Sequence, residues 1–236
     1  SKIEEQINPS IQLTLSDKDF DYLDSNKKEF VKTVLPIIIN ENQNILMIRS
    51  FVNELKGKLE TFRTLNNNEI RKLNDIAKKY NIKYQNKHKL DLVDEILSNV
   101  DVIPNSIVLA QAAIESGWGK SRFAKEYNAL FGEYTYDDSE GVVPLERENG
   151  DTHLIKSFSS YSNSVESYFD NINSHYAYED FRVIRNVMRK RNNFSNVNLL
   201  VNKLSTYAED ENYIKTIRQV IKTNNFEIFD QKTISY

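Results

Sequence analysis

The sequence contains no cysteine, and it has only 6 glycines and 4 prolines among its 236 residues. The absence of cysteine excludes disulfide bonds, thiol catalysis and cysteine-ligated metal sites. Tight turns depend on glycine and proline, so the scarcity of these residues argues against a turn-rich all-β fold. Long segments without either residue favour helices instead.

Long apolar runs and an excess of positive charge are also missing. No apolar run approaches the roughly 20 residues that a membrane-spanning helix needs, and we expect no membrane span. The net charge is −3, with acidic residues interleaved among the basic ones, which does not favour nucleic-acid binding. The chain begins at Ser1 without a basic and apolar leader, so we expect a mature or trimmed form from which a signal peptide could have been removed.

The first hundred residues show helical patterns. Ser16 is predicted to start a helix, and apolar residues then recur at spacings of three and four from Phe30 to Leu59, with Pro36 expected to kink this stretch or break it into two helices. An Asn66-x-x-Glu69 capping box predicts a second helix, and Lys89–Val100 a third. We interpret residues 1–100 as an N-terminal helical extension whose apolar stripes are core rather than a catalytic site.

The pattern changes at residue 104, and we assign residues 101–230 to the main domain. A helix is predicted from Pro104 to Glu115, almost wholly apolar and therefore buried. Asn149-Gly150 lies between two β-prone runs and predicts a β-hairpin. Short helices are predicted around it and after it, including one capped by Asn163. The expected fold is α+β and predominantly helical.

Glu115 is the outstanding candidate for chemistry. It ends the buried helix and is followed by Ser-Gly-Trp-Gly. A buried carboxyl group must be protonated, paired or at the edge of a cleft, and a protonated carboxyl is what a glycosidase uses as its general acid. The residues alone leave an equal alternative, in which Glu115 bonds a structural partner and Trp118 belongs to the core.

Other kinds of site have weaker support. The three histidines, His88, His153 and His175, lack the spacing of metal ligands, so we expect them to be structural and expect neither a metal nor another cofactor. The sequence also lacks a Gly-x-Ser-x-Gly nucleophile motif and a glycine-rich phosphate loop.

Several motifs around Glu115 resemble a known family. The run from Val108 to Ala124, the following Asn128–Gly132, the Tyr161-x-x-x-x-Val165-x-x-Tyr168 pattern and the late Tyr207–Tyr213 segment resemble the bacterial β-N-acetylglucosaminidases, a family that includes autolysins and a flagellar rod-cap enzyme. The N-terminal helices and the segment from Gly141 to Pro144 resemble its Bax-like branch. The core resemblance covers roughly residues 100–225, and the branch resemblance covers nearly the whole chain.

The resemblance implies a lysozyme-like domain with a small β-hairpin lobe, and cleavage of the β-1,4 bond between N-acetylglucosamine and N-acetylmuramic acid in peptidoglycan. Glu115 matches the proton donor of the family. Glu146 matches a second carboxylate on the hairpin, with Glu148, Glu140, Asp137 and Asp138 as competitors. Without such a residue, the acetamido oxygen of the substrate could act as nucleophile. Tyr207 matches an active-site tyrosine that would orient this group or the water.

Substrate contacts are expected from side chains near these positions. The expected substrate-binding residues are Ser116, Trp118, Phe131, Tyr134, Tyr136 and Tyr213. The expected activity is that of a periplasmic or secreted endo-β-N-acetylglucosaminidase whose partner is the peptidoglycan glycan strand. A lytic transglycosylase and a non-catalytic glycan-binding scaffold are the alternatives, and the N-terminal helices could also dock a protein partner.

Overall fold

The computed structural model describes residues 13–144, 150 and 153–233, and it confirms a predominantly helical α+β fold. The chain forms two compact units. We call the described residues within 42–104 and 170–214 the Asp101 unit, and those within 13–41, 105–169 and 215–233 the Glu115 unit. The predicted division into domains at residue 100 stays a prediction.

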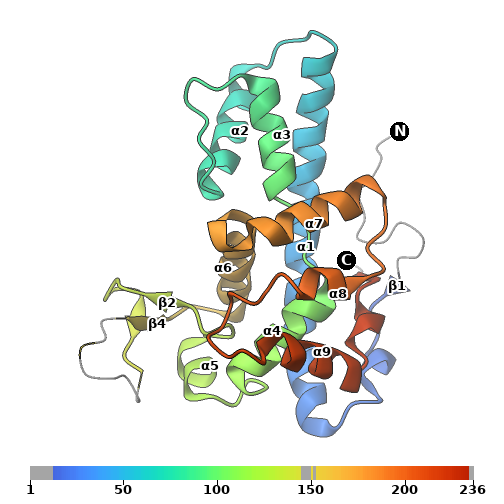
Figure 1. Cartoon of the computed structure of the whole chain (residues 1–236), viewed down its shortest axis with the longest axis vertical. Helices are drawn as coiled ribbons and strands as arrows, with labels where there is room; N and C mark the ends of the chain where they lie inside the picture. Colours follow the sequence, from blue (N-terminus) through green and yellow to red (C-terminus); the bar gives the residue numbers. More distant parts are fainter. Residues whose placement is uncertain (1–12, 145–149, 151–152, 234–236) are drawn as a thin grey trace. The chain divides into compact units, whose positions relative to one another are not determined.

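Helices account for most of the described chain (Figure 1). No helix among the described residues is both long and apolar enough to cross a bilayer. The α-helices are α1 (Ser25–Glu60), α2 (Asn67–Lys79), α3 (Lys89–Asn99), α4 (Asn105–Ser116), α5 (Arg122–Tyr127), α6 (Tyr161–Ser174), α7 (Glu179–Lys190), α8 (Val197–Val201) and α9 (Tyr213–Thr223). Three short 3-10 helices are η1 (Asp17–Phe20), η2 (Tyr176–Tyr178) and η3 (Phe226–Phe229).

Helix α1 is continuous through Pro36, so of the two predicted outcomes the break into two helices is wrong, and the kink stays a prediction. A proline inside a helix removes one backbone hydrogen bond and crowds the preceding turn. The side chains on either side of it, Val34, Leu35, Ile38 and Ile39, are all buried. Their packing offsets the lost bond, and the helix extends over 36 residues.

Two capping sequences act as local start signals for helices. The side chain of Asn66 accepts a hydrogen bond from the backbone N–H of Glu69, and the Glu69 carboxylate accepts one from the N–H of Asn66, as the capping box predicted. Helix α6 begins earlier than predicted, because Ser160 rather than Asn163 caps it: Ser160 Oγ accepts a hydrogen bond from the backbone N–H of Asn163 at 3.2 Å. The difference moves the start of α6 to Tyr161.

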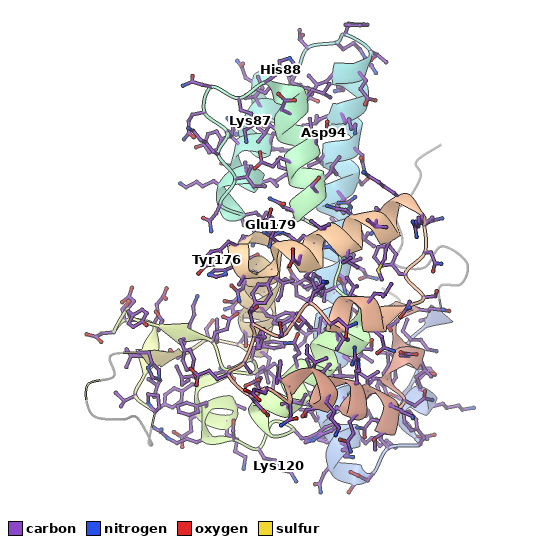
Figure 2. All side chains as sticks on the ribbon, in the orientation of Figure 1. Lys87, His88, Asp94, Lys120, Tyr176 and Glu179 are labelled. Atoms are coloured by element: carbon purple, nitrogen blue, oxygen red, sulfur yellow. The ribbon has the colours of Figure 1, made fainter. Side chains whose placement is uncertain are left out.

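In the Asp101 unit, α2 and α3 lie beside the C-terminal half of α1 (Figure 1). Ion pairs join these helices at their surfaces. Lys58 Nζ on α1 lies 2.6 Å from a carboxylate oxygen of Glu69 on α2. Lys56 Nζ lies 2.8 Å from Asp94 of α3, which Figure 2 labels. The apolar stripes predicted in this region form part of the core, with Val52, Leu55, Leu73, Ala77, Leu92, Val93 and Ile96 buried.

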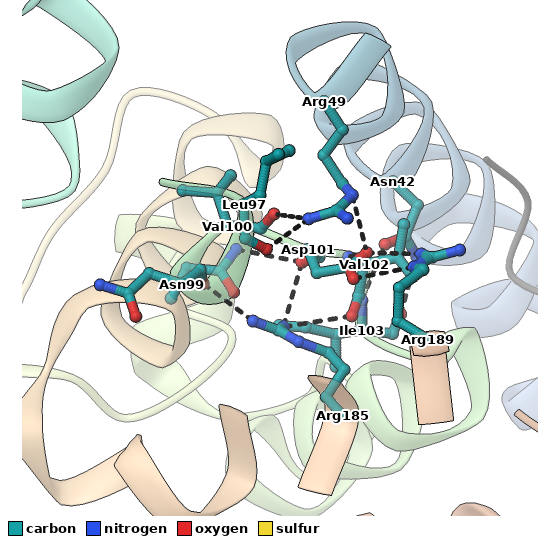
Figure 3. A network of polar contacts seen from close by, with 11 residues as sticks. Asn42, Arg49, Leu97, Asn99, Val100, Asp101, Val102, Ile103, Arg185 and Arg189 are labelled. Carbon is teal, nitrogen blue, oxygen red and sulfur yellow. Dashed lines mark hydrogen bonds and ion pairs between the residues drawn. The ribbon is translucent and has the colours of Figure 1, made fainter. Parts of the chain in front are cut away.

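A buried carboxylate, Asp101, joins α1 to α7 (Figure 3). Arg189 of α7 donates two hydrogen bonds to it, at 3.0 and 2.6 Å. Arg49 of α1 lies 3.5 Å from the same carboxylate, and its Nη1 donates to the carbonyls of Leu97 and Val100 at the end of α3. The network thus fixes the segment that leads into α4.

Arg185 completes this network through backbone carbonyls. Its guanidinium donates to the carbonyl oxygens of Asn99, Asp101 and Val102. Burial opposes ionisation of Asp101, but Arg49, Arg189 and Arg185 together hold its pKa below the ordinary value. Burial lowers the pKa of Arg185 to about 9. Asp101 is therefore a carboxylate whose charge balances a buried arginine cluster.

In the Glu115 unit, the segment before α1 packs against the segment after α9. Strand β1 (Leu13–Thr14) pairs in parallel with β5 (Lys232–Thr233). Asp19 of η1 lies 3.0 Å from Lys232 Nζ, and the rings of Phe20 and Phe229 lie 5.9 Å apart. Segments about 210 residues apart in the chain thus close the same unit around α4.

A three-stranded antiparallel sheet forms the small β-lobe of this unit. Its strands are β2 (Tyr134–Thr135), β4 (Leu154–Lys156) and β3 (Gly141–Val142), with β4 in the centre. Val142 and Tyr134 both pair with Ile155. The expected pairing of the runs around residues 142 and 155 is confirmed, and β2 adds a third strand to them. Most of the predicted Asn149-Gly150 turn lies outside the described residues.

Candidate active site

Helix α4 positions Glu115. All its residues from Asn105 to Ala113 are buried, and so is Ser116. Ile114 and Glu115 are only half-buried, so the helix emerges from the core at its C-terminal end. The uninterrupted run of small and aliphatic residues explains this, because a helix that is apolar on every side must be surrounded by protein. Glu115 is consequently held by a rigid element at the edge of the core.

The N-terminus of α4 is fixed by the end of η3. Asp230 accepts hydrogen bonds from the backbone N–H of Ser106 at 2.7 Å and from its hydroxyl at 2.8 Å. The side-chain amide of Asn105 donates to the carbonyl of Phe229 at 2.9 Å. Burial raises the pKa of Asp230 to about 7, against the lowering effect of its bonds to Ser106. This carboxyl group is therefore close to its titration point at neutral pH.

The C-terminus of α4 turns sharply through three successive left-handed residues. Gly117, Trp118 and Gly119 have φ values of 57°, 57° and 78°. Trp118 pays a conformational penalty there that glycine would not. The hydroxyl of Ser116 donates to the carbonyl of Ala112 and accepts from the N–H of Gly119 at 2.9 Å. Ser116, expected to bind substrate, is buried and shapes this turn; a substrate contact stays a prediction.

The ring of Trp118 packs into an aromatic cluster. It lies 5.7 Å from Phe30 in an edge-to-face arrangement and 6.0 Å from Phe226. Lys27 Nζ lies over the ring, 5.0 Å from its centroid. These contacts are what offsets the left-handed backbone at Trp118. The structure thus places the ring among protein side chains, and its stacking on a sugar stays a prediction.

Gly132 lies directly against the carboxyl group of Glu115. A Cβ atom at Gly132 would be 3.0 Å from Glu115 Oε2, and its φ is 64°. Any side chain at this position would displace the carboxyl group and also strain the backbone. The segment is held from α6, where Ser164 Oγ accepts the N–H of Leu130 at 3.1 Å. The Asn128–Gly132 turn therefore forms one wall beside Glu115.

Phe131 belongs to the core beneath this wall. Its side chain is 2% exposed, and its ring stacks on Tyr168 of α6 at 4.4 Å. The Tyr168 hydroxyl donates to the side-chain oxygen of Gln111, one turn before Glu115 on α4. Phe131 was expected to bind substrate. In the structure its buried ring supports the packing between α4 and α6, and a substrate contact stays a prediction.

Tyr134 and Tyr136 are the exposed aromatic side chains of the β-lobe. They are 66% and 77% exposed, and the Tyr134 ring lies edge-to-face with His153 at 4.7 Å. Tyr134 is only two positions after Gly132, so the lobe starts beside Glu115. These rings are available to a ligand from solvent, and their contact with glycan stays a prediction.

The competing carboxylates fall into two groups. Glu146 and Glu148 lie outside the described residues, so their placement relative to Glu115 is a prediction only. Asp137, Asp138 and Glu140 are exposed at the tip of the lobe. Hydrogen bonds from the side chain and backbone of Ser139 hold the pKa of Asp137 below its ordinary value. Asp137 is thus ionised and fixes the local turn.

Tyr207 and Tyr213 lie together in the Asp101 unit. Their rings stack almost in parallel, 5.8 Å apart with an angle of 8°. Tyr178 lies 6.1 Å from Tyr207. Tyr213 is buried, whereas Tyr207 is half-buried. The structure brings these two predicted residues together, and their catalytic and binding roles stay predictions.

Three residues that belong to the family motifs were not predicted as site residues from the sequence. Gly132 contacts the carboxyl group of Glu115, and Gln111 and Tyr168 link the helix that bears Glu115 to α6. Only the i, i+4 relation of Gln111 to Glu115 on a helix could have suggested a shared face. Among the described residues, no three His, Asp or Glu side chains are grouped as metal ligands would be.

The comparisons with known proteins point in one direction. Residues 90–226 match the glucosaminidase family model, described as mannosyl-glycoprotein endo-beta-N-acetylglucosaminidase. The chain is 33% identical to the protein Bax of Escherichia coli K12 over 184 residues, which is 77% of this chain and 63% of Bax. It is 34% identical to the peptidoglycan hydrolase FlgJ of Escherichia coli K12 over 92 residues, 35% of this chain and 29% of FlgJ.

The chain therefore spans less than two thirds of either relative. Among solved structures, it is similar to the catalytic domain of the autolysin Auto from Listeria monocytogenes, with a TM-score of 0.49 and 16% identity. That match covers 93% of this chain and 100% of the other.

Proposed function

Because the chain belongs to the glucosaminidase family, we propose that it is a peptidoglycan hydrolase with Glu115 as its general acid. The bond cleaved is the β-1,4 linkage between N-acetylglucosamine and N-acetylmuramic acid. The similarity to FlgJ, which is itself described as a peptidoglycan hydrolase, supports this substrate. An enzyme with this substrate would act in the periplasm or at the cell wall.

One observation carries the proposal. Glu115 stands half-buried at the end of an otherwise buried helix, with the backbone of Gly132 packed on its carboxyl group. Partial burial disfavours the carboxylate and favours the protonated acid. A carboxyl group that keeps its proton can donate it to the leaving glycosidic oxygen.

The second half of the reaction needs a group on the other side of the sugar. Glu146 would activate water or stabilise the oxocarbenium-like transition state. In the substrate-assisted alternative, the 2-acetamido oxygen attacks the anomeric carbon instead. The Tyr207 hydroxyl would orient the acetamido group or the water in either case. Tyr134 and Tyr136 would contact the glycan strand through their exposed rings.

The proposal is tested on purified sacculi with the wild-type chain and Glu115→Gln. The wild type should clear the suspension and release products with reducing N-acetylglucosamine ends. Glu115→Gln should lose at least two orders of magnitude in rate, since the amide cannot supply the proton. Equal cleavage by both proteins would remove Glu115 from the mechanism.

Product analysis separates the two other activities. Products with 1,6-anhydro-muramic ends would identify a lytic transglycosylase, which also uses a single acidic residue. Binding to sacculi without any released product would identify a glycan-binding scaffold. Either result would contradict the proposed hydrolase activity. Binding without released product would in addition contradict any catalytic role.

A further inference from the structure

A second carboxylate follows immediately after the residue that contacts Glu115. Gly132 packs on Oε2 of Glu115, and the next residue in the chain is Glu133. Consecutive Cα atoms are 3.80 Å apart, so the Cα of Glu133 lies within roughly 8 Å of that oxygen. The carboxylates considered from the sequence were all further along the lobe, and Glu133 was not among them.

Glu133 is held in place from two elements. Its Oε2 accepts a hydrogen bond of 2.6 Å from the hydroxyl of Ser167 on α6. Its backbone carbonyl accepts the N–H of Lys156 on β4 at 2.8 Å. The side chain is half-buried, unlike the exposed acids at the tip of the lobe. A carboxylate anchored in this way keeps its charge at one position.

The part of α6 that holds Glu133 also contacts the helix that bears Glu115. Tyr168, the neighbour of Ser167, donates its hydroxyl proton to Gln111 of α4. Gln111 and Glu115 are four residues apart and so share one face of that helix. Glu133 and Glu115 are thus fixed to the same small assembly of α4, α6 and the 130–133 segment.

From this geometry, and resting on the proposed function, we propose that Glu133 is a positioning residue that keeps Glu115 in its proton-donating form. A fixed negative charge on a residue whose Cα lies within roughly 8 Å of a carboxyl group opposes the ionisation of that group, and partial burial strengthens the effect. The Ser167 hydrogen bond favours the ionised form of Glu133 itself. The pair therefore divides its roles: Glu133 stays charged, and Glu115 retains the proton.

Other charged side chains lie on the elements packed around Glu133. Glu166 is on α6 beside Ser167, and Lys156 is on β4, with its Nζ 5.6 Å from the centroid of the Phe158 ring. On α5, Arg122 pairs with the exposed Glu126 at 3.4 Å. To keep the charges of these groups constant, the test must change the charge of Glu133 alone. Glu133→Gln does so, because the amide oxygen still accepts the bond from Ser167.

The experiment follows the protonation of Glu115 directly, by NMR titration of protein carrying carbon-13 at its glutamate carboxyl groups. The Glu115 signal is identified by its loss in Glu115→Gln. In Glu133→Gln, the midpoint of this titration should fall by about one pH unit, the size expected for loss of one nearby like charge. Glu126→Gln removes an equal charge from the surface of the same unit and should leave the midpoint within a few tenths of a unit.

A second variant covers the case in which Glu133→Gln does not fold. Ser167→Ala keeps the charge of Glu133 but removes the hydrogen bond that holds its carboxylate in place. The midpoint of the Glu115 titration should then fall, by a smaller amount than in Glu133→Gln. Circular dichroism and the thermal midpoint establish that each variant is folded. An unchanged Glu115 titration in the folded variants overturns the inference.

Activity gives an independent readout. The alkaline limb of the pH profile of kcat/KM on sacculi should shift downward by the same amount in Glu133→Gln, giving a roughly tenfold lower rate on that limb. The rate on the acidic side should stay within about twofold. If the wild type shows no cleavage but the Glu115 titration shifts, the proposed function fails and the positioning role stands. If the wild type cleaves sacculi but the alkaline limb does not shift in Glu133→Gln, the proposed function stands and the positioning role fails.

Discussion

Gly132 lies directly against the carboxyl group of Glu115 in the candidate site. A Cβ atom at Gly132 would lie 3.0 Å from Glu115 Oε2, and the residue has a φ of 64°. Both the space and the backbone conformation therefore require glycine at this position. The orientation of the Glu115 carboxyl group, the proposed proton donor, therefore depends on the absence of a Cβ atom at Gly132.

Gly132→Ala should accordingly impair catalysis more than stability. The left-handed backbone costs about 1 kcal/mol with alanine. The added methyl also pushes the Glu115 carboxyl group by a few tenths of an ångström. A misplacement of about 1 Å can cost a hundredfold in rate, so we expect this smaller shift to cost about tenfold. Gly117→Ala is the matched control, because it has the same strain, with a φ of 57°, and nothing within 4 Å of its Cβ. Cleavage rates and urea unfolding of both variants check this; equal rates would contradict it.

Tyr207→Phe should lower turnover without changing the fold. The ring stacks on Tyr213, and phenylalanine retains that stacking while losing only the hydroxyl. If the hydroxyl orients the acetamido group or water, the rate should fall by about ten- to a hundredfold. Tyr176→Phe, at a residue 82% exposed, is the control and should cleave normally. Turnover is measured on sacculi; wild-type turnover by Tyr207→Phe would remove its hydroxyl from the mechanism.

The double variant Tyr134→Ala, Tyr136→Ala should weaken binding to glycan strands. Exposed aromatic faces contribute by stacking, and removing two of them should cost several-fold in affinity. Sedimentation with insoluble sacculi measures the bound fraction. Phe62→Ala removes a ring of the other unit that is even more exposed, at 97%, and should bind as the wild type does. Unchanged sedimentation of the double variant would place the glycan elsewhere.

Asp101→Asn should strongly destabilise the protein. The substitution leaves Arg49, Arg185 and Arg189 without the carboxylate that balances them, and removing one partner of a buried ion pair costs about 3–5 kcal/mol. Asp21→Asn, which removes an exposed pair with Lys28, should cost less than about 1 kcal/mol. Urea denaturation gives both values. A small loss for Asp101→Asn would mean that the backbone carbonyls alone satisfy the arginines.

Asp230 should make stability depend on pH. Its pKa is raised from 3.8 to about 7 in the folded protein, so the folded state retains a proton that the unfolded chain releases. Stability from this group is greatest below pH 4 and is lost as the pH rises through about 7. Because the residue is partly exposed, we expect a decline of roughly 1–2 kcal/mol between pH 5 and 8.

Asp230→Asn should flatten this decline, because the amide accepts the same bond from Ser106 without titrating. Unfolding free energies at the two pH values provide the measurement. Glu126→Gln, which changes an exposed acid, should keep the full decline. A decline that persists in Asp230→Asn would have to come from another group.

Helices with their own local signals could be predicted from the sequence. The Asn66–Glu69 capping box and the apolar stripe of α1 depend on residues three or four positions apart, so both appear in the pattern. The break considered at Pro36 was wrong because the burial of the side chains around this proline depends on tertiary packing, which the local sequence does not show. Strands β1, β2 and β5 were missed because each is only two residues long, which is too short to show a periodic pattern. Each also pairs with a segment that is distant in the sequence.

Only part of the candidate site could be predicted from the sequence, for the same reason. Glu115 could be identified from its neighbours in the chain and from the family motifs. Its contact with Gly132 joins residues 17 positions apart, and the Tyr168–Gln111 bond joins residues 57 apart. The burial of Phe131 depends on similar packing, against Tyr168 of α6. The sequence does not show this contact, and the ring was therefore expected among the substrate-binding residues.

The aromatic cluster around Trp118 limits how the polypeptide can be shortened. Phe30 and Phe226 come from opposite ends of the chain, yet both pack on the residue three positions after Glu115. A recombinant fragment that starts at residue 101 would contain every motif of the candidate site and still lack Phe30 and Lys27. Its indole would be left partly uncovered in the left-handed turn. Fragments intended for crystallisation or assay should therefore retain the chain from residue 13 onward.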